Sequence, residues 1–398
     1  MTQPSDTFDS ALPPEPLGDD LRSQFALDQQ VAFLNHGSFG ARPHCVLQAQ
    51  DRWRRQMEAD PVEFLDRAGP LLLDHLKDVT GRFLGAEPGD FGFLTSATEA
   101  INAVLRSLDF GPGDELLTTD HAYPGIRNSL QYVARRSGAT LVEVPVPLPL
   151  ASHDTVVAAI EEALTPRTRL VLVDHITSFT ALLFPLERII DVCRKRGVEV
   201  LADGAHAPGM IDLSVERLAA TYYAANLHKW VCAPISAAVL WVTSDNQQRI
   251  HPLVISNFLG EGFEREFLWQ ATRDVTSWLA AEEAIAFGER LGWEMIRRHN
   301  HEMAVWVQQM LCESWQAEPN SPLDGSMLGS MVSITLPEAV RRQFDDHRAL
   351  GAHLYQAHRI EVPVTEWNGR WLIRPCCHIY NRPEEYLRLA ETINELMH

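Results

Sequence analysis

The feature that most constrains the fold is a regular alternation of short apolar runs with helical stretches, which begins near residue 91. The apolar runs are FGFLT, DELLTT, TLVEVPV, RLVLVD, VEVLAD, TYYAANL and SAAVLWV, and helical patterns separate most of them. Alternation at this spacing is typical of a largely parallel sheet covered on both faces by helices. We therefore predict an α/β fold.

The pattern changes beyond about residue 285, where long amphipathic helices at roughly 279–317 lead into MVSITL, a helix near 337–357, IEVPV, RWLIRP and a final helix. This change predicts a smaller α+β unit after the sheet. The predicted organisation is a Pro-rich, partly disordered arm over 1–30, a segment over 31–60 that packs with the small domain, a large domain over 61–284 and a small domain over 285–398.

Charge and cysteine content exclude several classes of protein. The 34 basic and 53 acidic side chains give a net charge of −19, which repels nucleic acids and anionic membranes. No apolar run has the length of a membrane span, and the N-terminus lacks the pattern of a signal peptide. The six cysteines show no metal-ligand spacing and are too sparse for a disulfide framework. We expect a cytoplasmic protein without a metal site.

An acidic residue and a lysine follow two neighbouring apolar runs. Asp203 ends VEVLAD and precedes small residues, as a partner for a buried cationic ring nitrogen requires, although aspartate is also a common turn residue. Lys229 follows YYAANLH and precedes Trp230 and an apolar run. Desolvation there favours a nucleophilic amine able to form a Schiff base, whereas an isolated lysine is usually a surface residue. The spacing of 26 residues, across one strand, favours a joint role.

A third segment, FLTSATEAINAVLRSL, reads as a strand, a turn and an amphipathic helix. Ser96, Ala97 and Thr98 place backbone N–H groups and a hydroxyl at the helix N-terminus, where a phosphate is favourably held. Ser96 and Glu99 also match a capping box. Both interpretations remain open from the sequence.

Together and in this order, the three segments resemble the class V aminotransferase family of fold-type-I pyridoxal 5′-phosphate (PLP) enzymes, over about residues 31–395. The resemblance implies a seven-stranded, mainly parallel sheet in the large domain. It also implies that Lys229 forms the Schiff base with PLP, that Asp203 pairs with the pyridine nitrogen, and that His206 lies by the 3′-oxygen of the ring. By the same likeness, Thr98 with its neighbouring backbone, Asn226 and His228 hold the phosphate.

The resemblance nominates further polar residues around the cofactor. Tyr123 in HAYPGI stands where the family stacks a ring on the cofactor face and is a candidate catalytic residue, although an aromatic after a strand is often part of the core. VDHITSFTALLFPL places His175, Thr177 and Ser178 where the family has polar groups near the 3′-oxygen and the substrate.

Arg374 in RWLIRPCCHIYNRPEEY is similar to the family arginine that binds the substrate α-carboxylate. The match departs from the family pattern at Pro375 and Cys376, and a structural salt bridge is the alternative role. Thr272 in WQATRDVTSWLA resembles a family threonine that reaches the phosphate of the neighbouring subunit, with Ala271 where glycine is common. This element implies a homodimer with shared active sites.

The segment LNHGSFGARP resembles the entry segment of isopenicillin N epimerase-like proteins and nominates Asn35 and His36 as substrate-binding residues. The shared chemistry that this implies is an external aldimine with an amino acid and removal of the α-proton by Lys229. An epimerase needs a second proton donor, for which Tyr123, His36 and His175 are candidates. A C–S lyase of a cysteine conjugate or sulfoxide, as in ergothioneine formation, and an aminotransferase remain alternatives.

Three other functions are less favoured. A cysteine desulfurase needs a loop cysteine upstream of the arginine, and QAHRIEVPVTEWNG contains none, while Cys376 and Cys377 follow Arg374 on a predicted strand. A non-catalytic relative is disfavoured by the complete set of cofactor residues. An NAD-dependent oxidoreductase is set aside because no Gly-x-Gly-x-x-Gly motif follows a strand.

Overall fold

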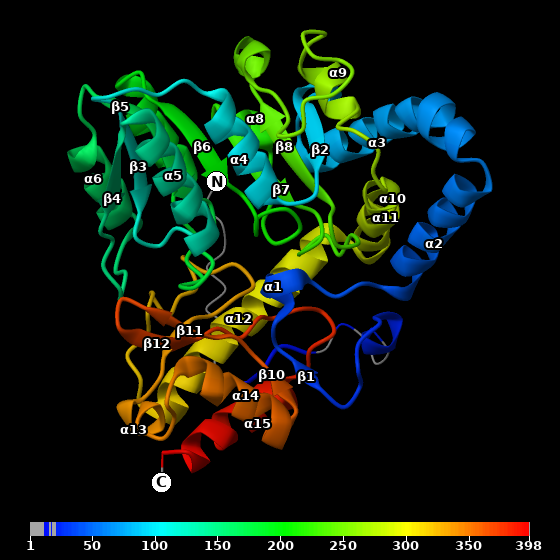
Figure 1. Cartoon of the computed structure of the whole chain (residues 1–398). Helices are drawn as coiled ribbons and strands as arrows, with labels where there is room; N and C mark the ends of the chain where they lie inside the picture. The colour runs from blue at the N-terminus through cyan, green and yellow to red at the C-terminus, as the bar shows by residue number, and fades with distance from the viewer. Residues whose placement is uncertain (1–11, 16, 18–20, 398) are drawn as a thin grey trace, which may run out of the picture.

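The computed structural model describes residues 12–15, 17 and 21–397. It has an upper layer built on a central sheet and a smaller lower layer that contains the C-terminus (Figure 1). Residues 1–11, 16 and 18–20 of the arm predicted over 1–30 lie outside the described residues. Part of the remainder packs closely, since Phe25 is buried against the rings of Phe287, His378 and Tyr380.

The central sheet has seven strands in the spatial order β2-β8-β7-β6-β5-β3-β4. Their bounds are β2 (Phe91–Leu94), β3 (Glu115–Thr119), β4 (Thr140–Val144), β5 (Thr168–Asp174), β6 (Glu199–Asp203), β7 (Tyr222–Asn226) and β8 (Ala238–Val242). β8 runs antiparallel to both of its neighbours, and the other pairs are parallel. The predicted mainly parallel seven-stranded sheet is therefore confirmed.

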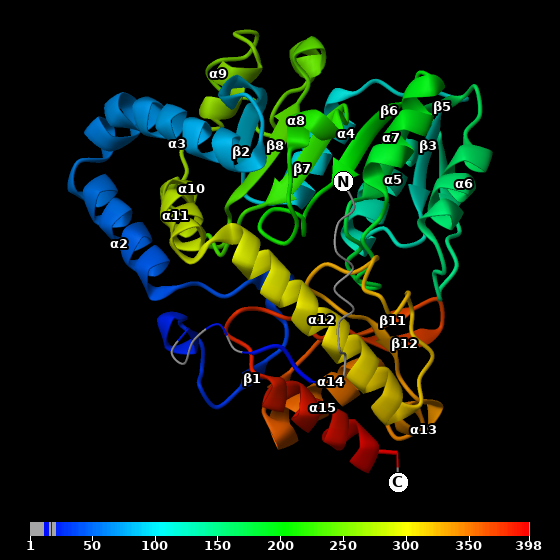
Figure 2. The same cartoon turned by 180° about the vertical axis from the view of Figure 1, so that it is seen from behind.

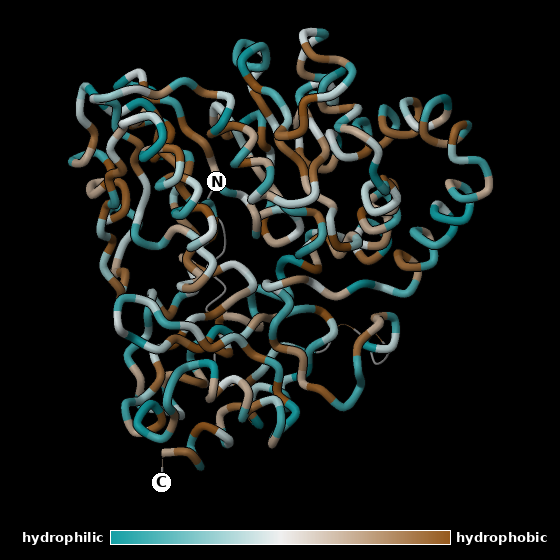
Figure 3. Tube along the Cα trace, viewed as in Figure 1, coloured by the Kyte–Doolittle hydropathy of each residue, from teal (hydrophilic) through white to brown (hydrophobic). Residues whose placement is uncertain are grey.

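Helices cover both faces of this sheet, as Figures 1 and 2 show from opposite sides. One face carries α4 (Ala97–Ser107) and α5 (Pro124–Ser137), and the other carries α6 (His153–Ala163), α7 (Leu186–Lys195) and α8 (Val215–Leu218). In β5, Leu170 and Leu172 pack toward α4 and α5, while Val171 and Val173 pack on the opposite face. Burial of both faces explains why the strands are continuously apolar, which is visible along the central strands in Figure 3.

The lower layer has its own apolar core and a three-stranded antiparallel sheet in the order β11-β12-β9. Its elements are β9 (Ile334–Thr335), α13 (Glu338–Arg341), α14 (His347–His358), β10 (Ile360–Glu361), β11 (Val364–Trp367), β12 (Arg370–Ile373) and α15 (Pro383–Glu395). The long helix α12 (Trp293–Trp315) runs diagonally from the upper layer into the lower one (Figures 1 and 2).

The N-terminal segment predicted over 31–60 divides between the layers. β1 (Ala32–Phe33) pairs in parallel with β10, whereas α2 (His44–Ala59) packs against α10 (Thr276–Leu279) and α11 (Ala281–Leu291). The remaining helices are α1 (His36–Phe39), α3 (Gly69–Leu84) and α9 (Phe263–Leu268). The domain boundary predicted between residues 284 and 285 falls inside α11, so the helix continues across that position.

No helix among the described residues combines the length and the apolar character that crossing a bilayer requires.

Candidate active site

A cavity of about 180 Å³ lies where the carboxyl ends of several strands meet. Because β8 is antiparallel to both β2 and β7, the carboxyl ends of β2 and β7 share one edge with those of β5 and β6. Ten predicted site residues line the cavity: Ser96, Ala97, Thr98, Tyr123, Ser178, Asp203, His206, Asn226, His228 and Lys229. Ser38, Phe39, Asp174 and Ala205 line it as well.

Lys229 directly follows the turn after β7, and its amine lies 3.1 Å from Nε2 of His206. Desolvation, with a further contribution from the positive charge of Arg374, lowers the pKa of Lys229 to about 8. The chain has three lysines. Of the other two, Lys77 forms an ion pair with Glu264, and Lys195 is exposed at the end of α7. Lys229 is therefore the lysine equipped to act as a nucleophile.

Two buried carboxyl groups lie side by side at the floor of the cavity. Asp174 ends β5 and Asp203 ends β6, and the two residues are register partners. Burial raises the pKa of both, and the charge of Asp203 raises that of Asp174 further. Asp174 Oδ2 has no hydrogen-bond partner among the residues that the structure describes. The sequence analysis did not select Asp174, although an acid at the end of an apolar strand was the signal that selected Asp203.

The N-terminus of α4 also lines the cavity. The Ser96 hydroxyl accepts a hydrogen bond from the Glu99 N–H at 3.1 Å, and the Glu99 carboxylate accepts from the Thr95 N–H at 2.7 Å. Ser96 is therefore the N-cap of α4, as the capping interpretation predicts, but Glu99 bonds to Thr95 and does not complete a capping box with the Ser96 N–H. The Ala97 N–H donates to Asn226 Oδ1 at 2.8 Å, which ties α4 to the end of β7. The cap and an anion site are compatible, because the capped turn still faces the cavity.

Arg374 is buried just behind the cavity lining. Its Nη1 donates to the Ser178 carbonyl at 2.5 Å and its Nη2 to the Ser38 hydroxyl at 3.4 Å, while Nε is buried and has no partner in the described part of the chain. No carboxylate of the described residues forms an ion pair with it, so the salt-bridge alternative finds no support in the structure. A buried guanidinium without a counter-ion favours an anionic ligand.

Asn35 and His36, which the sequence analysis nominated as substrate-binding residues, do not line the cavity. His36 Nε2 lies 3.0 Å from the Lys229 carbonyl, and Nδ1 lies 2.8 Å from the Tyr380 hydroxyl. Because a carbonyl only accepts, Nε2 carries the proton and Nδ1 accepts from Tyr380. Asn35 donates to Glu361 at 2.8 Å. His36 thus holds the backbone at Lys229, whereas Asn35 ties the start of α1 to β10.

His36 also belongs to a buried cluster with Cys232 and His378, whose potential ligand atoms lie within 4.8 Å of one another. The two imidazole rings stack at 4.1 Å with an interplanar angle of 18°. An ion cannot lie in the planes of two rings stacked in this way, and His36 Nε2 already donates to Lys229. The cluster therefore packs behind the cavity and does not have the geometry of a metal centre.

Three other predicted residues lie outside the cavity lining. The Thr177 hydroxyl is 2.7 Å from that of Thr180 and accepts from the Leu182 N–H at 2.8 Å. Thr272 is exposed between α9 and α10. His175 places Nδ1 2.9 Å from the Tyr223 hydroxyl, and burial lowers its pKa to about 4. These positions correct the expectation that Thr177 and His175 face the cavity of their own chain.

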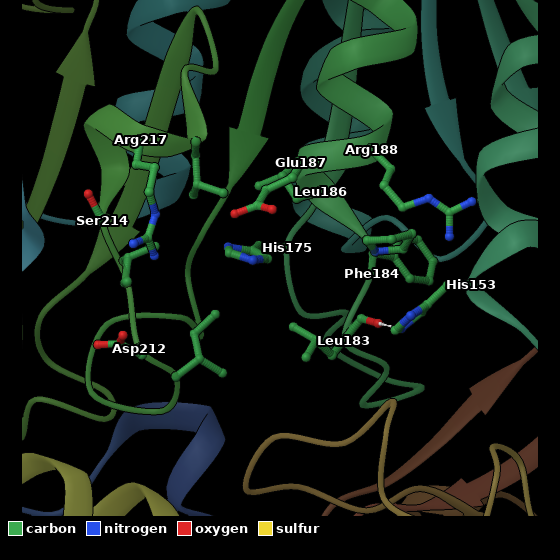
Figure 4. Close-up of a pocket in the computed structure, with 14 residues that line it drawn as sticks. His153, His175, Leu183, Phe184, Leu186, Glu187, Arg188, Asp212, Ser214 and Arg217 are labelled. Atoms are coloured by element: carbon green, nitrogen blue, oxygen red, sulfur yellow. Dashed lines mark hydrogen bonds between the residues drawn. The ribbon is translucent and has the colours of Figure 1, made fainter. Parts of the chain in front are cut away.

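His175 instead lines a second cavity of about 330 Å³, between the start of α7 and the loop before α8 (Figure 4). Leu183, Phe184 and Leu186 provide much of its apolar wall. This cavity shares no lining residue with the cavity around Lys229 and contains no lysine. Its chemistry does not fit a Schiff base.

The cavity around Lys229 fits PLP. It offers an amine for the aldehyde, the carboxyl group of Asp203 for the pyridine nitrogen, and the capped N-terminus of α4 with Asn226 and His228 for the phosphate. The unpartnered Asp174 Oδ2 and Arg374 Nε show that polar groups in and beside the cavity lack partners within the part of the chain that the structure describes. This set of groups at the carboxyl edge of a mainly parallel seven-stranded sheet defines a fold-type-I PLP-dependent enzyme.

Comparison with known proteins agrees with this class. Residues 39–358 match the family described as Aminotransferase class-V. The chain is 34% identical to isopenicillin N epimerase of Amycolatopsis lactamdurans, over 94% of this chain and 97% of that protein. It is 32% identical to putative L-cysteine desulfhydrase 1 of Oryza sativa subsp. japonica, over 92% of this chain and 83% of that protein.

Solved structures of C-DES are also similar, at 25% sequence identity. The complex of this cystine C–S lyase with its product cysteine persulfide superposes with a TM-score of 0.78, over 92% of this chain and 97% of that chain. A C-DES mutant with glycine covalently linked to PLP gives a TM-score of 0.81, over 94% and 98%. The protein belongs to the class V aminotransferase family of PLP-dependent enzymes.

Proposed function

We propose that the protein binds a small amino acid by its α-carboxylate at Arg374 and removes the α-proton with the amine of Lys229. The observation that carries this proposal is that the buried guanidinium of Arg374 lies near the amine of Lys229. A buried guanidinium has no counter-ion in the described chain, and its charge acts on an amine whose pKa is lowered to about 8. An amine with this pKa is a competent base near neutral pH.

The cofactor and the chain divide the work. When bound, PLP withdraws electrons from the α-carbon of the substrate. Asp203 would hold the ring nitrogen, and the segment 96–98 with Asn226 and His228 would hold the phosphate. Lys229 holds and moves the proton, and Arg374 orients the substrate by bidentate pairing with its carboxylate.

Among the reactions that begin in this way, we place C–S bond cleavage by β-elimination first. Elimination needs a single acid–base group, because Lys229 can take the α-proton and then protonate the leaving group. The lining of the cavity supports this choice, since His36 and His175, two of the three candidates for a second proton donor, lie outside it. The similarity to L-cysteine desulfhydrases and to the cystine C–S lyase C-DES is consistent with it.

Epimerisation is the second candidate, and Tyr123 is the observation that favours it. The Tyr123 side chain lines the cavity and is 42% exposed, so it is available as a proton donor to a substrate. Similarity to isopenicillin N epimerase supports the same reaction. Transamination stays a third possibility because it also needs only Lys229.

One panel of reactions tests the proposal. The PLP-loaded enzyme is incubated with small amino acids and cysteine conjugates, and thiol with pyruvate, α-proton exchange in deuterated water, inversion, and keto-acid formation are measured. We expect thiol and pyruvate from a cysteine derivative. Inversion without elimination would support epimerisation, and the absence of α-proton exchange with every amino acid would contradict the proposal.

Borohydride reduction provides the matched control. The label is expected on Lys229 in the wild-type protein and in the Lys195→Ala variant, and it is expected to be lost in Lys229→Ala. Recovery of the label on Lys77 or Lys195 would contradict the assignment of the reactive amine.

We also propose a homodimer with shared sites. Thr272 is exposed and does not line the cavity of its own chain, as a contact to a partner requires. Leu253, Val254, Ile255 and Leu259 expose large apolar side chains on one short segment, which is typical of a surface that another chain covers.

A further inference from the structure

Two consecutive residues, Lys229 and Trp230, contact the imidazole ring of His206, one at each ring nitrogen. Trp230 Nε1 donates to His206 Nδ1 at 3.3 Å, and Lys229 Nζ lies 3.1 Å from His206 Nε2. His206 and Trp230 are both buried. Trp230, His206 and Lys229 are thus linked in series by hydrogen bonds, and Lys229 lines the cavity.

The chemistry of the Trp230 indole determines which atoms donate and which accept in these hydrogen bonds. An indole N–H only donates, so His206 Nδ1 has to accept. Burial, reinforced by the charge of Lys229, lowers the pKa of His206 well below its usual range, so the ring is neutral and carries its proton on Nε2. Nε2–H then points at Lys229 Nζ. That contact is a hydrogen bond only when Nζ offers a lone pair, which an ammonium group does not have.

We propose that Trp230 is a positioning residue whose indole N–H holds His206 in the Nε2–H tautomer and thereby favours the unprotonated amine of Lys229. If Lys229 were protonated, its ammonium group and the His206 Nε2–H would both be donors, and no hydrogen bond could form between them. Relief would require His206 to move its proton to Nδ1, where it would face the Trp230 N–H instead. This inference does not depend on which reaction of the family the enzyme performs.

The other charged groups near Lys229 act on its pKa without a hydrogen bond to Nζ. Arg374 lowers the pKa, whereas Asp203, Asp174 and Cys376 raise it. Burial and the positive charges of Lys229 and Arg374 lower the pKa of the His206 imidazole. Among the described residues, His206 is the hydrogen-bond partner of Lys229 Nζ. Removal of one N–H from Trp230 leaves all of these groups in place.

The test is the pH dependence of Schiff-base formation. Trp230→Phe keeps an aromatic ring beside His36 but removes the N–H. The rate constant for PLP addition to the full-length apoprotein is measured by absorbance against pH. We expect the wild-type rate to rise with pH and to level off above about 8, because the unprotonated amine reacts and the pKa of Lys229 is lowered to about 8. In Trp230→Phe we expect the inflection about one pH unit higher, because His206 can then change tautomer and accept from the ammonium.

Trp241→Phe is the matched control. Trp241 is a buried tryptophan on β8 whose Nε1 has no hydrogen-bond partner among residues 12–15, 17 and 21–397, so its replacement is expected to leave the inflection unchanged. In a His206→Leu background, Trp230→Phe is expected to cause no further displacement of the inflection, because the imidazole that links Trp230 to Lys229 is absent. An unchanged inflection in folded Trp230→Phe, or an equal displacement in the His206→Leu background, would overturn the inference.

A second measurement needs neither the tryptophan variant nor the cofactor. In the full-length protein labelled with ¹⁵N in its histidine rings, the pair of ring resonances lost in His206→Leu belongs to His206. We expect chemical shifts of the Nε2–H tautomer. The Nδ1–H tautomer would refute the inference and leave the proposed reaction untouched, so the two failures are distinguishable.

Discussion

At the scale of single residues, Arg374 shows how a missing counter-ion of a buried side chain indicates a binding site. The guanidinium is buried, donates to a backbone carbonyl and a serine hydroxyl, and leaves Nε without a partner. A structural arginine at this depth normally has a carboxylate partner, because burying an unpaired charge is costly. The missing partner is therefore the substrate carboxylate in our proposal.

Replacing Arg374 with glutamine is expected to lower kcat/KM for the amino-acid substrate by about a hundredfold to a thousandfold, mainly through KM, since one bidentate charged pair contributes about 3–4 kcal/mol. Thermal stability is expected to hold or rise, because the buried cation has no partner in the free enzyme. Steady-state kinetics and thermal unfolding check both parts. Arg370→Gln, an exposed arginine of β12 that donates to a backbone carbonyl, is the control. Unchanged kcat/KM in Arg374→Gln would contradict the assignment.

At the scale of elements, the four-residue helix α1 serves as a brace for the loop that carries Lys229. His36 donates to the Lys229 carbonyl, and Arg42 just after the helix donates to the His228 carbonyl at 3.2 Å. Gly40 ends α1 with φ of +72°, and a Cβ atom there would lie 2.3 Å from the His228 carbonyl oxygen. The motif LNHGSFG is thus a structural support, and only its Ser38 and Phe39 reach the cavity.

Gly40→Ala is expected to destabilise the fold by about 2–4 kcal/mol, because it combines left-handed backbone strain with overlap against a carbonyl oxygen. The affinity for PLP is expected to fall as well, since the Lys229 loop is displaced. Denaturant unfolding and cofactor titration measure the two effects. Gly351→Ala, in α14 with no atom within 4 Å of the added Cβ, is the control and should be neutral or stabilising by about 0.5–1 kcal/mol. Equal stability of both variants would argue against the brace.

At the scale of the whole molecule, the site is assembled from distant parts of the chain. The sheet supplies Asp174, Asp203 and Lys229 from one edge, whereas Arg374 arrives from the lower layer after β12. Thr272 is left on the surface, away from the cavity of its own chain. A second copy of the chain would complete this arrangement.

Mixing two inactive variants tests the shared site. Lys229→Ala removes the amine, and Thr272→Val is expected to weaken the binding of PLP in the partner so far that the site is inactive at the PLP concentration of the assay. If each site uses both chains, a mixed dimer has one site with both defects and one site with neither. Co-expression is then expected to restore about a quarter of the wild-type activity. The separately expressed variants, mixed without subunit exchange, are the control, and failure of co-expression to restore activity would contradict shared sites.

What the sequence determined by itself is the sheet and the residues at its edge. Continuous apolar runs require burial on both faces, and residues that follow parallel strands meet at one edge whatever the details of packing. Asp203, His206, Asn226 and Lys229 were therefore predictable as neighbours. Tertiary structure decided which nearby side chains enter the cavity: His36 and Thr177 use their polar atoms on the protein, while Asp174 joins Asp203 through strand register. The reason is that hydrogen-bond partners depend on distances between segments far apart in the chain, which local patterns do not contain.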